Sequence, residues 1–244
     1  MTILVLAATA RELAALAPQV YEEETAPPEM ELVQAPSRMF RNCGPIFFCV
    51  TGVGPINAAL ATGMSLARLA ERGSRPDVVL NAGLAGSYDL NAMPLRTLCR
   101  VREEIQPEYG LNDGRSVTAQ AFSWPMWKRT EGKGTVFDRI AMDDAGCLSE
   151  SLAAAGDRFT ECSSLTVAGV SASFARAEAL RDKYRADLEN MEGFAVAYAC
   201  ARAAIPCVEI RCVSNKVGPR RQDEKDFSGA LKTLGGVLPS LNLA

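Results

Sequence analysis

Short runs of apolar and β-branched residues alternate with longer segments of helical periodicity along most of the chain. Six of these runs predict strands, at residues 2–8, 46–51, 77–82, 95–101, 165–170 and 207–214. Their nearly continuous apolar character is typical of strands that are buried on both faces of a sheet. The alternation therefore predicts an α/β fold in which helices cover a central sheet.

Three segments that adjoin these strands predict helices. Residues 55–72 carry an apolar stripe and begin with a proline in the first turn. Residues 192–204 are rich in alanine and place Phe194 and Tyr198 four residues apart, on one face. Residues 223–236 predict a last, more polar helix.

Two segments interrupt the alternation, residues 21–44 and residues 103–138, and both predict loops or hairpins. Loops longer than about 12–15 residues within a domain are often functional. The second segment is a candidate wall of a ligand pocket through its aromatic residues Tyr109, Phe122, Trp124 and Trp127. A surface insertion with its own small apolar cluster is the alternative. Since no repeat and no linker is present, residues 1–244 are predicted to form a single domain.

Histidine is absent, which excludes Ser-His-Asp and Cys-His nucleophile pairs and metal sites with histidine ligands. Acid–base chemistry must then use carboxylates, Lys, Tyr, Cys or water. The 26 basic and 29 acidic side chains give a net charge of −3 and no broad basic face. Nucleic acid is therefore not expected as a partner.

The eight cysteines form no Cys-x-x-Cys pair, and most lie in apolar runs, so we expect reduced core residues. The amino-terminal residues lack the basic stretch of a signal peptide. No apolar stretch approaches the roughly 20 residues that a transmembrane helix needs. Together these features predict a soluble cytoplasmic protein that does not bind membranes.

Polar residues and glycines gather where the predicted strands end, which is where α/β sheets build their sites. Glu12 follows the first strand in Ala7-Ala-Thr-Ala-Arg-Glu12, and Glu192 opens a helix in Glu189-Asn-Met-Glu-Gly193. Either carboxylate could instead serve only the dipole or the cap of its helix. Glycine turns follow two further strands, and Ser214 and Asn215 follow the last one. Asn215 could merely form a turn, but its amide can also donate and accept toward a ligand.

Four segments in this order make the chain resemble the nucleoside phosphorylase and nucleosidase superfamily. They are Thr51-Gly-Val-Gly-Pro-Ile-Asn-Ala-Ala-Leu, Asn81-Ala-Gly-Leu-Ala-Gly, Asn190-Met-Glu-Gly and Glu209-Ile-Arg-Cys-Val-Ser-Asn215. Within it the chain is most similar to the futalosine hydrolase family, which removes hypoxanthine in menaquinone biosynthesis, through Glu189-Asn-Met-Glu-Gly and Ser214-Asn-Lys-Val-Gly-Pro-Arg. The resemblance implies one three-layer α/β/α domain with a mixed, largely parallel central sheet. It also implies a homo-oligomer, with a dimer expected, and neither cofactor nor metal.

The same resemblance implies the roles of individual residues. Glu12 would activate the attacking water, Glu192 would bind the ribose hydroxyls, and Met191 would pack against the sugar. Ala85 and Gly86 would bring their backbone close to base or sugar. Phe174 lies near the position of the family's base-stacking aromatic residue, with a core position as the alternative.

Asn215 stands where the related methylthioadenosine/S-adenosylhomocysteine nucleosidases usually carry Asp. A 6-oxopurine needs a donor at O6 and an acceptor for a protonated N7, and one amide supplies both. An ionised Asp would face the O6 lone pairs, and such a buried mismatch costs about 1–3 kcal/mol. Asn215 therefore favours hypoxanthine-type bases over adenine-type bases.

The chain also departs from its relatives. Leu84 stands where the nucleosidases usually have Ser, so a polar contact to Asn215 is either missing or supplied by Ser214. The segment Ala8-Thr-Ala-Arg-Glu replaces the phosphate loop of the phosphorylases, which favours water as the nucleophile.

The main hypothesis is hydrolysis of a 6-oxopurine nucleoside, with futalosine as the expected substrate. Purine nucleoside phosphorolysis, with Arg11 holding phosphate, and a non-catalytic nucleoside-binding protein are the alternatives. The benzoate-bearing 5′ extension of futalosine needs an apolar slot with a cation. The candidate cations in residues 103–138 are Arg115, Lys128 and Arg129.

Overall fold

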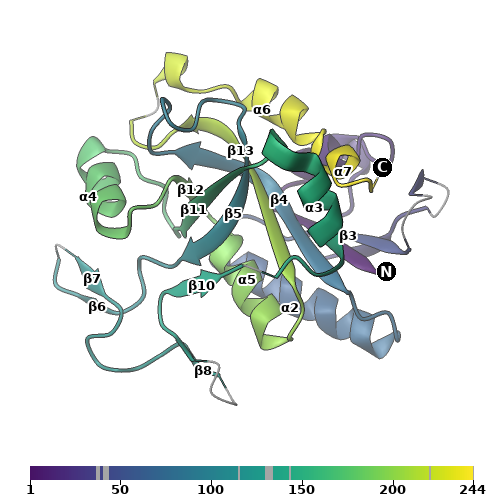
Figure 1. The fold of residues 1–244 in the computed structure, drawn as a ribbon, viewed down its shortest axis with the longest axis horizontal. Coiled ribbons are helices and arrows are strands. Elements are labelled where there is room, and N and C mark those ends of the chain that lie inside the picture. Colours follow the sequence, from purple (N-terminus) through teal and green to yellow (C-terminus); the bar gives the residue numbers. More distant parts are fainter. Residues whose placement is uncertain are drawn as a thin grey trace.

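The structure is a computed structural model that describes residues 1–36, 39–40, 44–114, 116–129, 134–142, 144–219 and 221–243. A mixed β-sheet lies at its centre, with helices on both faces (Figure 1). The strands of this sheet are β1 (Ile3–Ala7), β2 (Leu32–Gln34), β3 (Ile46–Val50), β4 (Val78–Ser87), β5 (Leu98–Ile105), β10 (Arg139–Ala141), β11 (Thr160–Thr166), β12 (Leu188–Asn190) and β13 (Cys207–Lys216). The predicted α/β class is confirmed.

The strand pairings close part of this sheet into a ring. β13 runs parallel to β4 along its length and antiparallel to β5. β11 lies parallel to both β5 and β12, and β12 returns antiparallel to the end of β4. The ring β4–β13–β5–β11–β12 therefore gathers side chains from five strands around one buried interior. On the other edge of β4, the strands β1 and β3 continue the sheet in parallel.

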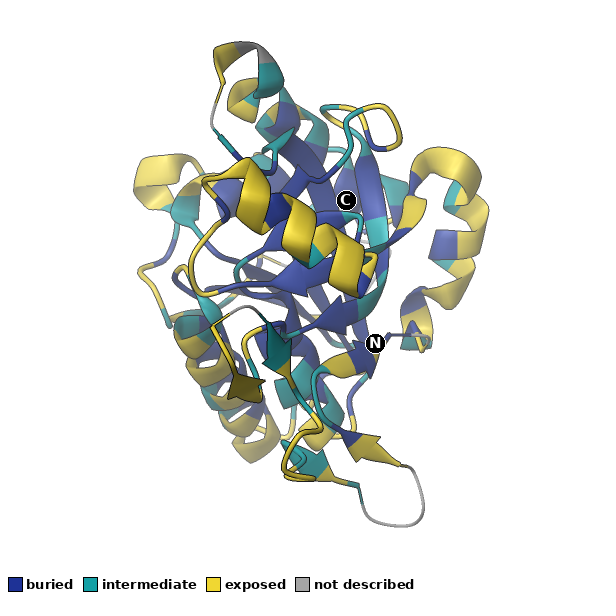
Figure 2. Ribbon diagram, turned by 90° about the vertical axis from the view of Figure 1, so that its left-hand side faces the viewer, coloured by how far each residue is buried: buried dark blue, intermediate teal, exposed yellow. Residues whose placement is uncertain are grey.

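Helices cover the two faces of the sheet because alternate residues of its strands point to opposite sides. On one face are α2 (Pro55–Glu71) and α5 (Gly193–Arg202), which pack with Leu4 and Leu6 of β1. On the other are α1 (Ala10–Leu16), α3 (Ser149–Ala155), α6 (Phe227–Leu234) and α7 (Val237–Ser240), which pack with Ile3 and Val5. α4 (Phe174–Tyr184) lies beyond the ends of β11 and β12 (Figure 1). Figure 2 shows the buried strands between helices whose outer faces are exposed.

The remaining elements of the fold are short strands and 3₁₀ turns. They are β6 (Leu111–Asn112), β7 (Val117–Thr118), β8 (Trp127–Lys128), β9 (Thr135–Val136) and the 3₁₀ turns Glu23–Thr25, Gly146–Leu148, Gly156–Arg158 and Gln222–Glu224. The predicted loops or hairpins of residues 103–138 are confirmed as the pairs β6–β7 and β8–β9, except that residues 103–105 complete β5. Residues 21–44 contribute β2, which pairs antiparallel with β3.

Several predicted boundaries are wrong. The strand expected at 165–170 is β11, which lies mostly earlier, at Thr160–Thr166. The strand expected at 77–82 continues to Ser87, since the glycines that predicted a turn remain inside β4. The helices predicted at 55–72 and 192–204 are confirmed as α2 and α5. The last helix predicted at 223–236 is only partly right, since α6 is shorter and α7 follows it.

The cysteine prediction is partly wrong. All seven described cysteines are free, and six of them are buried, but Cys147 is exposed. Cys43 lies outside the described residues. Among the described helices, none combines the length and the apolar character that a membrane crossing requires.

Candidate active site

A pocket of about 270 Å³ opens where β1, β4, β12 and β13 reach their carboxyl ends. Its lining comprises Ala8, Thr9, Arg11, Glu12, Val53, Leu84, Ala85, Gly86, Val170, Glu189, Asn190, Met191, Glu192, Ser214, Asn215, Phe227 and Leu231. The structure thus brings together seven of the eight predicted site residues: Glu12, Ala85, Gly86, Met191, Glu192, Ser214 and Asn215. Six of these residues come from the ring strands β4, β12 and β13 or directly follow them, and Glu12 comes from α1, which follows the neighbouring strand β1.

Glu12 is held firmly in the first turn of α1. Its Oε2 accepts hydrogen bonds from the backbone N–H and the hydroxyl of Thr9, at 3.0 and 2.9 Å, while Thr9 caps the helix. Its Oε1 accepts from the backbone N–H of Leu84 at 2.8 Å. Residue 84 therefore contributes through its backbone. A carboxylate has about four lone-pair sites, so Glu12 keeps acceptor capacity for a water molecule.

The close approach of Glu12 to β4 depends on Gly83. A Cβ at this position would lie 2.8 Å from Glu12 Oε1 and 2.9 Å from Arg211 Nη1, so both polar groups occupy the space of the missing side chain.

Glu192 occupies the N-cap position of α5 and is 5% exposed. Its Oε1 accepts from the backbone N–H of Gly54 at 3.1 Å, and its Oε2 lies 3.4 Å from Arg211 Nη1. Burial raises the pKa of the Glu192 carboxyl, Arg211 and the Gly54 N–H lower it, and the carboxylates of Glu12 and Glu209 raise it again. Burial is thus the largest influence on the pKa of Glu192, and Arg211 offsets part of it.

Asn215 lies at a register shift of β13 beside Gly86. Its Oδ1 is 2.9 Å from the Ser214 hydroxyl, and its Nδ2 donates to the carbonyl of Lys216 at 2.8 Å. Ser214 therefore supplies the polar contact that Leu84 lacks. A Cβ on Gly86 would lie 3.0 Å from Asn215 Nδ2, so this glycine leaves room for the amide.

Phe174 is the predicted site residue that the structure does not bring to the pocket. It is the first residue of α4, which Ser173 caps, and its side chain is 40% exposed. Lys216 Nζ and the Arg221 guanidinium lie 5.9 and 5.4 Å from its ring. Helix α4 begins too late for the ring to reach the lining, and Val170 occupies that wall instead.

Sequence reasoning missed Glu189, which anchors this wall. Its Oε1 accepts from the backbone N–H of Ser171 at 2.8 Å, and its Oε2 accepts from the hydroxyls of Ser171 and Tyr88 at 2.7 and 3.0 Å. Burial and the Glu189 carboxylate raise the pKa of Tyr88, which keeps this phenol a donor. Glu189 thereby holds the segment that precedes α4.

Sequence reasoning also missed Arg211, which is 1% exposed on β13. It contacts Glu192 and donates its Nε–H to Glu209 at 2.7 Å. The sequence does carry a signal for this ion pair. Glu209 and Arg211 lie two residues apart in an apolar strand, so their opposite charges point to the same face of the sheet. Among the described residues, no group of three or more Cys, Asp and Glu could hold a metal ion.

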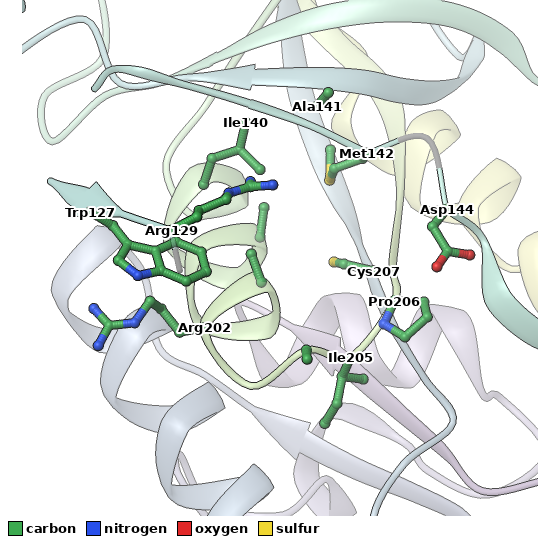
Figure 3. A pocket seen from close by; sticks show the side chains of 13 residues that line it. Trp127, Arg129, Ile140, Ala141, Met142, Asp144, Arg202, Ile205, Pro206 and Cys207 are labelled. Atoms are coloured by element: carbon green, nitrogen blue, oxygen red, sulfur yellow. The ribbon is translucent and has the colours of Figure 1, made fainter. Parts of the chain in front are cut away.

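A second pocket, of about 570 Å³, lies at the other end of β13, where Cys207 begins the strand (Figure 3). Residues Trp127 and Arg129 of the insertion line it, and the guanidinium groups of Arg129 and Arg202 both lie 5.2 Å from the Trp127 ring. No described residue of 103–138 lines the pocket of Glu12. Phe122 and Trp124 stack on each other at the surface, and Arg115 lies outside the described residues.

Comparisons with known proteins identify the family of the chain. The profile of the family described as the phosphorylase superfamily matches residues 2–235. The futalosine hydrolase of Streptomyces coelicolor is 34% identical over 191 residues, which are 78% of this chain and 75% of that protein.

Two solved structures share the fold. A futalosine hydrolase mutant of Helicobacter pylori has a TM-score of 0.71 at 18% identity, covering 99% of this chain and 98% of that one. The 5′-methylthioadenosine/S-adenosylhomocysteine nucleosidase of Helicobacter pylori, solved with an Immucillin inhibitor, has a TM-score of 0.73 at 18% identity, covering 99% and 97%.

Proposed function

Because the chain belongs to the phosphorylase superfamily and, within it, to the futalosine hydrolase family, we propose that it hydrolyses the N-glycosidic bond of futalosine. The products are hypoxanthine and the base-free sugar derivative, in menaquinone biosynthesis. The observation that carries this proposal is the convergence of Glu12, Glu192 and Asn215 on one pocket. These residues supply a water-activating base, a sugar-binding carboxylate and a base-reading amide.

The sugar side of the reaction uses the two carboxylates. Breaking the N-glycosidic bond develops positive charge on the ribose, as in the oxocarbenium-like transition states of glycoside hydrolysis. Glu192 accepts hydrogen bonds from the ribose hydroxyls, and its negative charge stabilises the developing cation. Glu12 orients a water toward C1′ and takes its proton as general base.

The base side uses the amide of Asn215. An amide has two N–H donors and two acceptor lone pairs, and Ser214 and Lys216 use one of each. One N–H then remains for O6 of hypoxanthine, and one lone pair remains for the protonated N7. An adenine-type base would present its amino group to the remaining N–H and leave a donor unpaired.

The volume of the pocket indicates which parts of futalosine it can enclose. At about 270 Å³ it lies below the roughly 300–1,000 Å³ of sites that enclose drug-sized ligands, so it fits base and ribose better than the whole of futalosine. The 5′ extension then projects through the mouth, where Val53, Phe227 and Leu231 offer apolar contact. Arg11 is the one basic side chain among the described lining residues and is the candidate partner of the benzoate carboxylate.

The decisive experiment is chromatographic detection of free base after incubation with futalosine, inosine or methylthioadenosine, each with and without phosphate. We expect hypoxanthine from futalosine without phosphate. Strict dependence on phosphate would replace hydrolysis by phosphorolysis, and adenine from methylthioadenosine would refute the role of Asn215. Hypoxanthine binding without any base release would indicate a binding protein.

We further propose that the protein is a cytoplasmic homodimer. Val53, just before α2, and Ile56 and Leu60, in its first turns, are 48%, 82% and 50% exposed. A second copy of this chain is the occupant that we infer for this apolar face, because exposed apolar patches mark interaction sites and two-fold dimers are the commonest assemblies of identical chains. A reducing compartment is supported by the free thiols of all seven described cysteines.

A further inference from the structure

Two buried carboxylates behind Glu192 have no role in the mechanism so far. Glu104 of β5 and Glu209 of β13 are both 0% exposed and do not line the pocket. Buried carboxylates are rare unless they are paired or hydrogen-bonded. Their contacts connect them to the amino terminus of α5, where Glu192 occupies the N-cap position.

Glu104 holds the groups that support this helix terminus. Its Oε1 is 2.6 Å from Asn190 Nδ2, and its Oε2 is 2.6 Å from the Thr166 hydroxyl. Asn190 Oδ1 in turn accepts from the backbone N–H groups of Glu192 and Gly193, both at 2.8 Å. Thr166 Oγ1 accepts from the N–H of Phe194 at 2.7 Å. Through these two neighbours Glu104 fixes the backbone from which the Glu192 side chain extends.

Glu209 holds the cation that faces Glu192. Its Oε1 accepts from Arg211 Nε at 2.7 Å, which is closer than the 3.4 Å between Arg211 Nη1 and Glu192 Oε2. Glu209 therefore takes the stronger ion pair and leaves Glu192 the weaker one. The negative charge of the Glu192 carboxylate is therefore less compensated by Arg211 and remains available to the ribose.

The two carboxyl groups are too close to be ionised together. A Cβ on Gly193 would lie 2.3 Å from Glu104 Oε1 and 2.5 Å from Glu209 Oε1, so these oxygens are less than about 5 Å apart. Arg211 is the one cation in contact with Glu209 or Glu192 among the described residues. The other titratable groups that face the cluster are Glu12 and the thiols of Cys162 and Cys207, none of which adds positive charge. Like charges at this distance in a dry interior force one group to hold a proton.

The contacts indicate which group holds it. Glu209 has a guanidinium partner, whereas the hydrogen bonds of Glu104 within the described part of the chain are to the neutral groups Asn190 and Thr166. If Glu104 Oε2 carries the proton, it donates to Thr166 Oγ1, and the Thr166 hydroxyl hydrogen turns to Asn190 Oδ1 at 3.4 Å. Burial, and next the Glu209 charge, raise the pKa of Glu104 well above its ordinary value, in agreement with this arrangement.

We propose that Glu104 and Glu209 are positioning residues for Glu192: Glu104 is a neutral carboxylic acid that holds Asn190 and Thr166, and Glu209 is the carboxylate that restrains Arg211. For its effect on turnover this inference rests on the proposed function. The protonation of the pair does not depend on it.

Matched substitutions separate the two members of the pair. Glu104→Gln keeps the shape and both hydrogen bonds, with its amide N–H donating to Thr166, whereas Glu104→Leu loses them. Glu209→Gln removes the charge that restrains Arg211, so Arg211 moves toward Glu192. The closer guanidinium then compensates more of the Glu192 charge, which stabilises the developing cation less. We expect kcat on futalosine to fall by about 10- to 100-fold in Glu104→Leu and Glu209→Gln, and Glu104→Gln to restore it to within about threefold of wild type.

The pH profile gives a readout that a purely structural role would not move. In Glu209→Gln the acid limb of kcat/KM shifts to lower pH by about one unit, because Arg211 then stabilises ionised Glu192 more strongly. In Glu104→Gln the acid limb of kcat/KM keeps its wild-type pH, because a neutral amide replaces a neutral carboxylic acid. Equal shifts in both glutamine variants, or a shift in Glu104→Gln alone, would overturn the assignment.

Infrared spectroscopy tests the proton without substrate, so it separates a failure of this inference from a failure of the proposed reaction. Wild-type protein at neutral pH should show the C=O stretch of a buried neutral carboxylic acid, with the expected small displacement in deuterium oxide. The band should vanish in Glu104→Gln and persist in Glu209→Gln, because burial, the larger cause of the raised Glu104 pKa, remains in that variant. Absence of the band from wild type contradicts the proposal, and this outcome does not depend on the folding of any variant. Loss of the band in Glu209→Gln but not in Glu104→Gln also contradicts it.

Discussion

The carboxylate of Glu12 is bound on one side by Thr9 and on the other by the backbone of Leu84, so its orientation is fixed before substrate arrives. Replacement by Gln keeps the size of the side chain but removes the base. We expect Glu12→Gln to bind hypoxanthine normally and to lose turnover by about 10²–10⁴-fold. Single-turnover kinetics and calorimetry measure the two effects, with the exposed Glu178→Gln as control. Near-normal kcat would remove Glu12 from the mechanism.

Arg11, which precedes Glu12 in the first turn of α1, allows a test of how the protein distinguishes futalosine from inosine. Its side chain is 58% exposed, and its nearest ion-pair contact, Glu23, is 4.0 Å away, which leaves the guanidinium available to a ligand. We expect Arg11→Gln to raise the KM of futalosine about fivefold, as suits a half-exposed ion pair, and to leave inosine unchanged. The KM of Arg11→Lys for futalosine should lie between the values of wild type and Arg11→Gln. Equal effects on both nucleosides would show that Arg11 does not read the 5′ extension.

Single residues differ in how far the sequence predicts them. Glu12, Glu192 and Asn215 follow strands in motifs with family precedent, so their convergence on the pocket was predictable. Glu104 and Arg211 were not, because a charged residue in a strand pattern normally indicates a solvent-facing side. Only the closure of the ring makes that side an interior.

At the scale of elements, α1 shows how a short helix carries a functional group. Thr9 and Glu12 form a reciprocal cap, so the same hydrogen bonds stabilise the helix and aim the carboxylate. We expect Thr9→Ala to lower the free energy of unfolding by about 1 kcal/mol and to reduce kcat, and Thr9→Ser to restore both. Ser173→Ala, which removes the cap of α4, is the matched control and should affect stability alone. A loss of stability without any loss of kcat would separate the cap from the site.

The misplaced strand β11 has a physical reason. Apolar character favours residues 165–170, but the strand uses polar residues such as Ser164 and Thr166, which are fully buried. These side chains hydrogen-bond to Asn190 on the neighbouring strand β12. A strand that faces a polar interior on one side does not show the pattern by which buried strands are recognised.

At the scale of the whole molecule, the buried acids make stability depend on pH. Burial raises the pKa of Glu104 and of Glu192 in the folded state. A carboxyl group with a higher pKa in the folded state contributes stability below its unfolded pKa of about 4.3 and loses that contribution as the pH rises through its folded pKa.

We therefore expect the free energy of unfolding to decline as the pH rises from about 4.5, by about 1.4 kcal/mol for each pH unit that separates the folded and unfolded pKa values. Urea denaturation at a series of pH values measures this slope. Glu104→Gln should flatten it, and Glu178→Gln on the surface should not. A slope that is unchanged in Glu104→Gln would place the proton elsewhere.

Association is the second property of the whole molecule. Ile56 is 82% exposed, so Ile56→Asp should leave the monomer folded and abolish the dimer. Light scattering after size-exclusion chromatography measures the mass, and Leu111→Asp on the distant hairpin is the control. If Ile56→Asp remains dimeric, the copies meet through another face.

The missing side chain at Gly193 links three positions that are far apart in sequence. A Cβ there would occupy the space of the carboxylate oxygens of Glu104 and Glu209. A lineage can therefore gain alanine at 193 only after it has lost these acids, and a lineage that keeps them must keep the glycine. Across relatives, positions 104, 193 and 209 should be inherited and exchanged as one unit, and their joint variation would record where this interior changed during evolution.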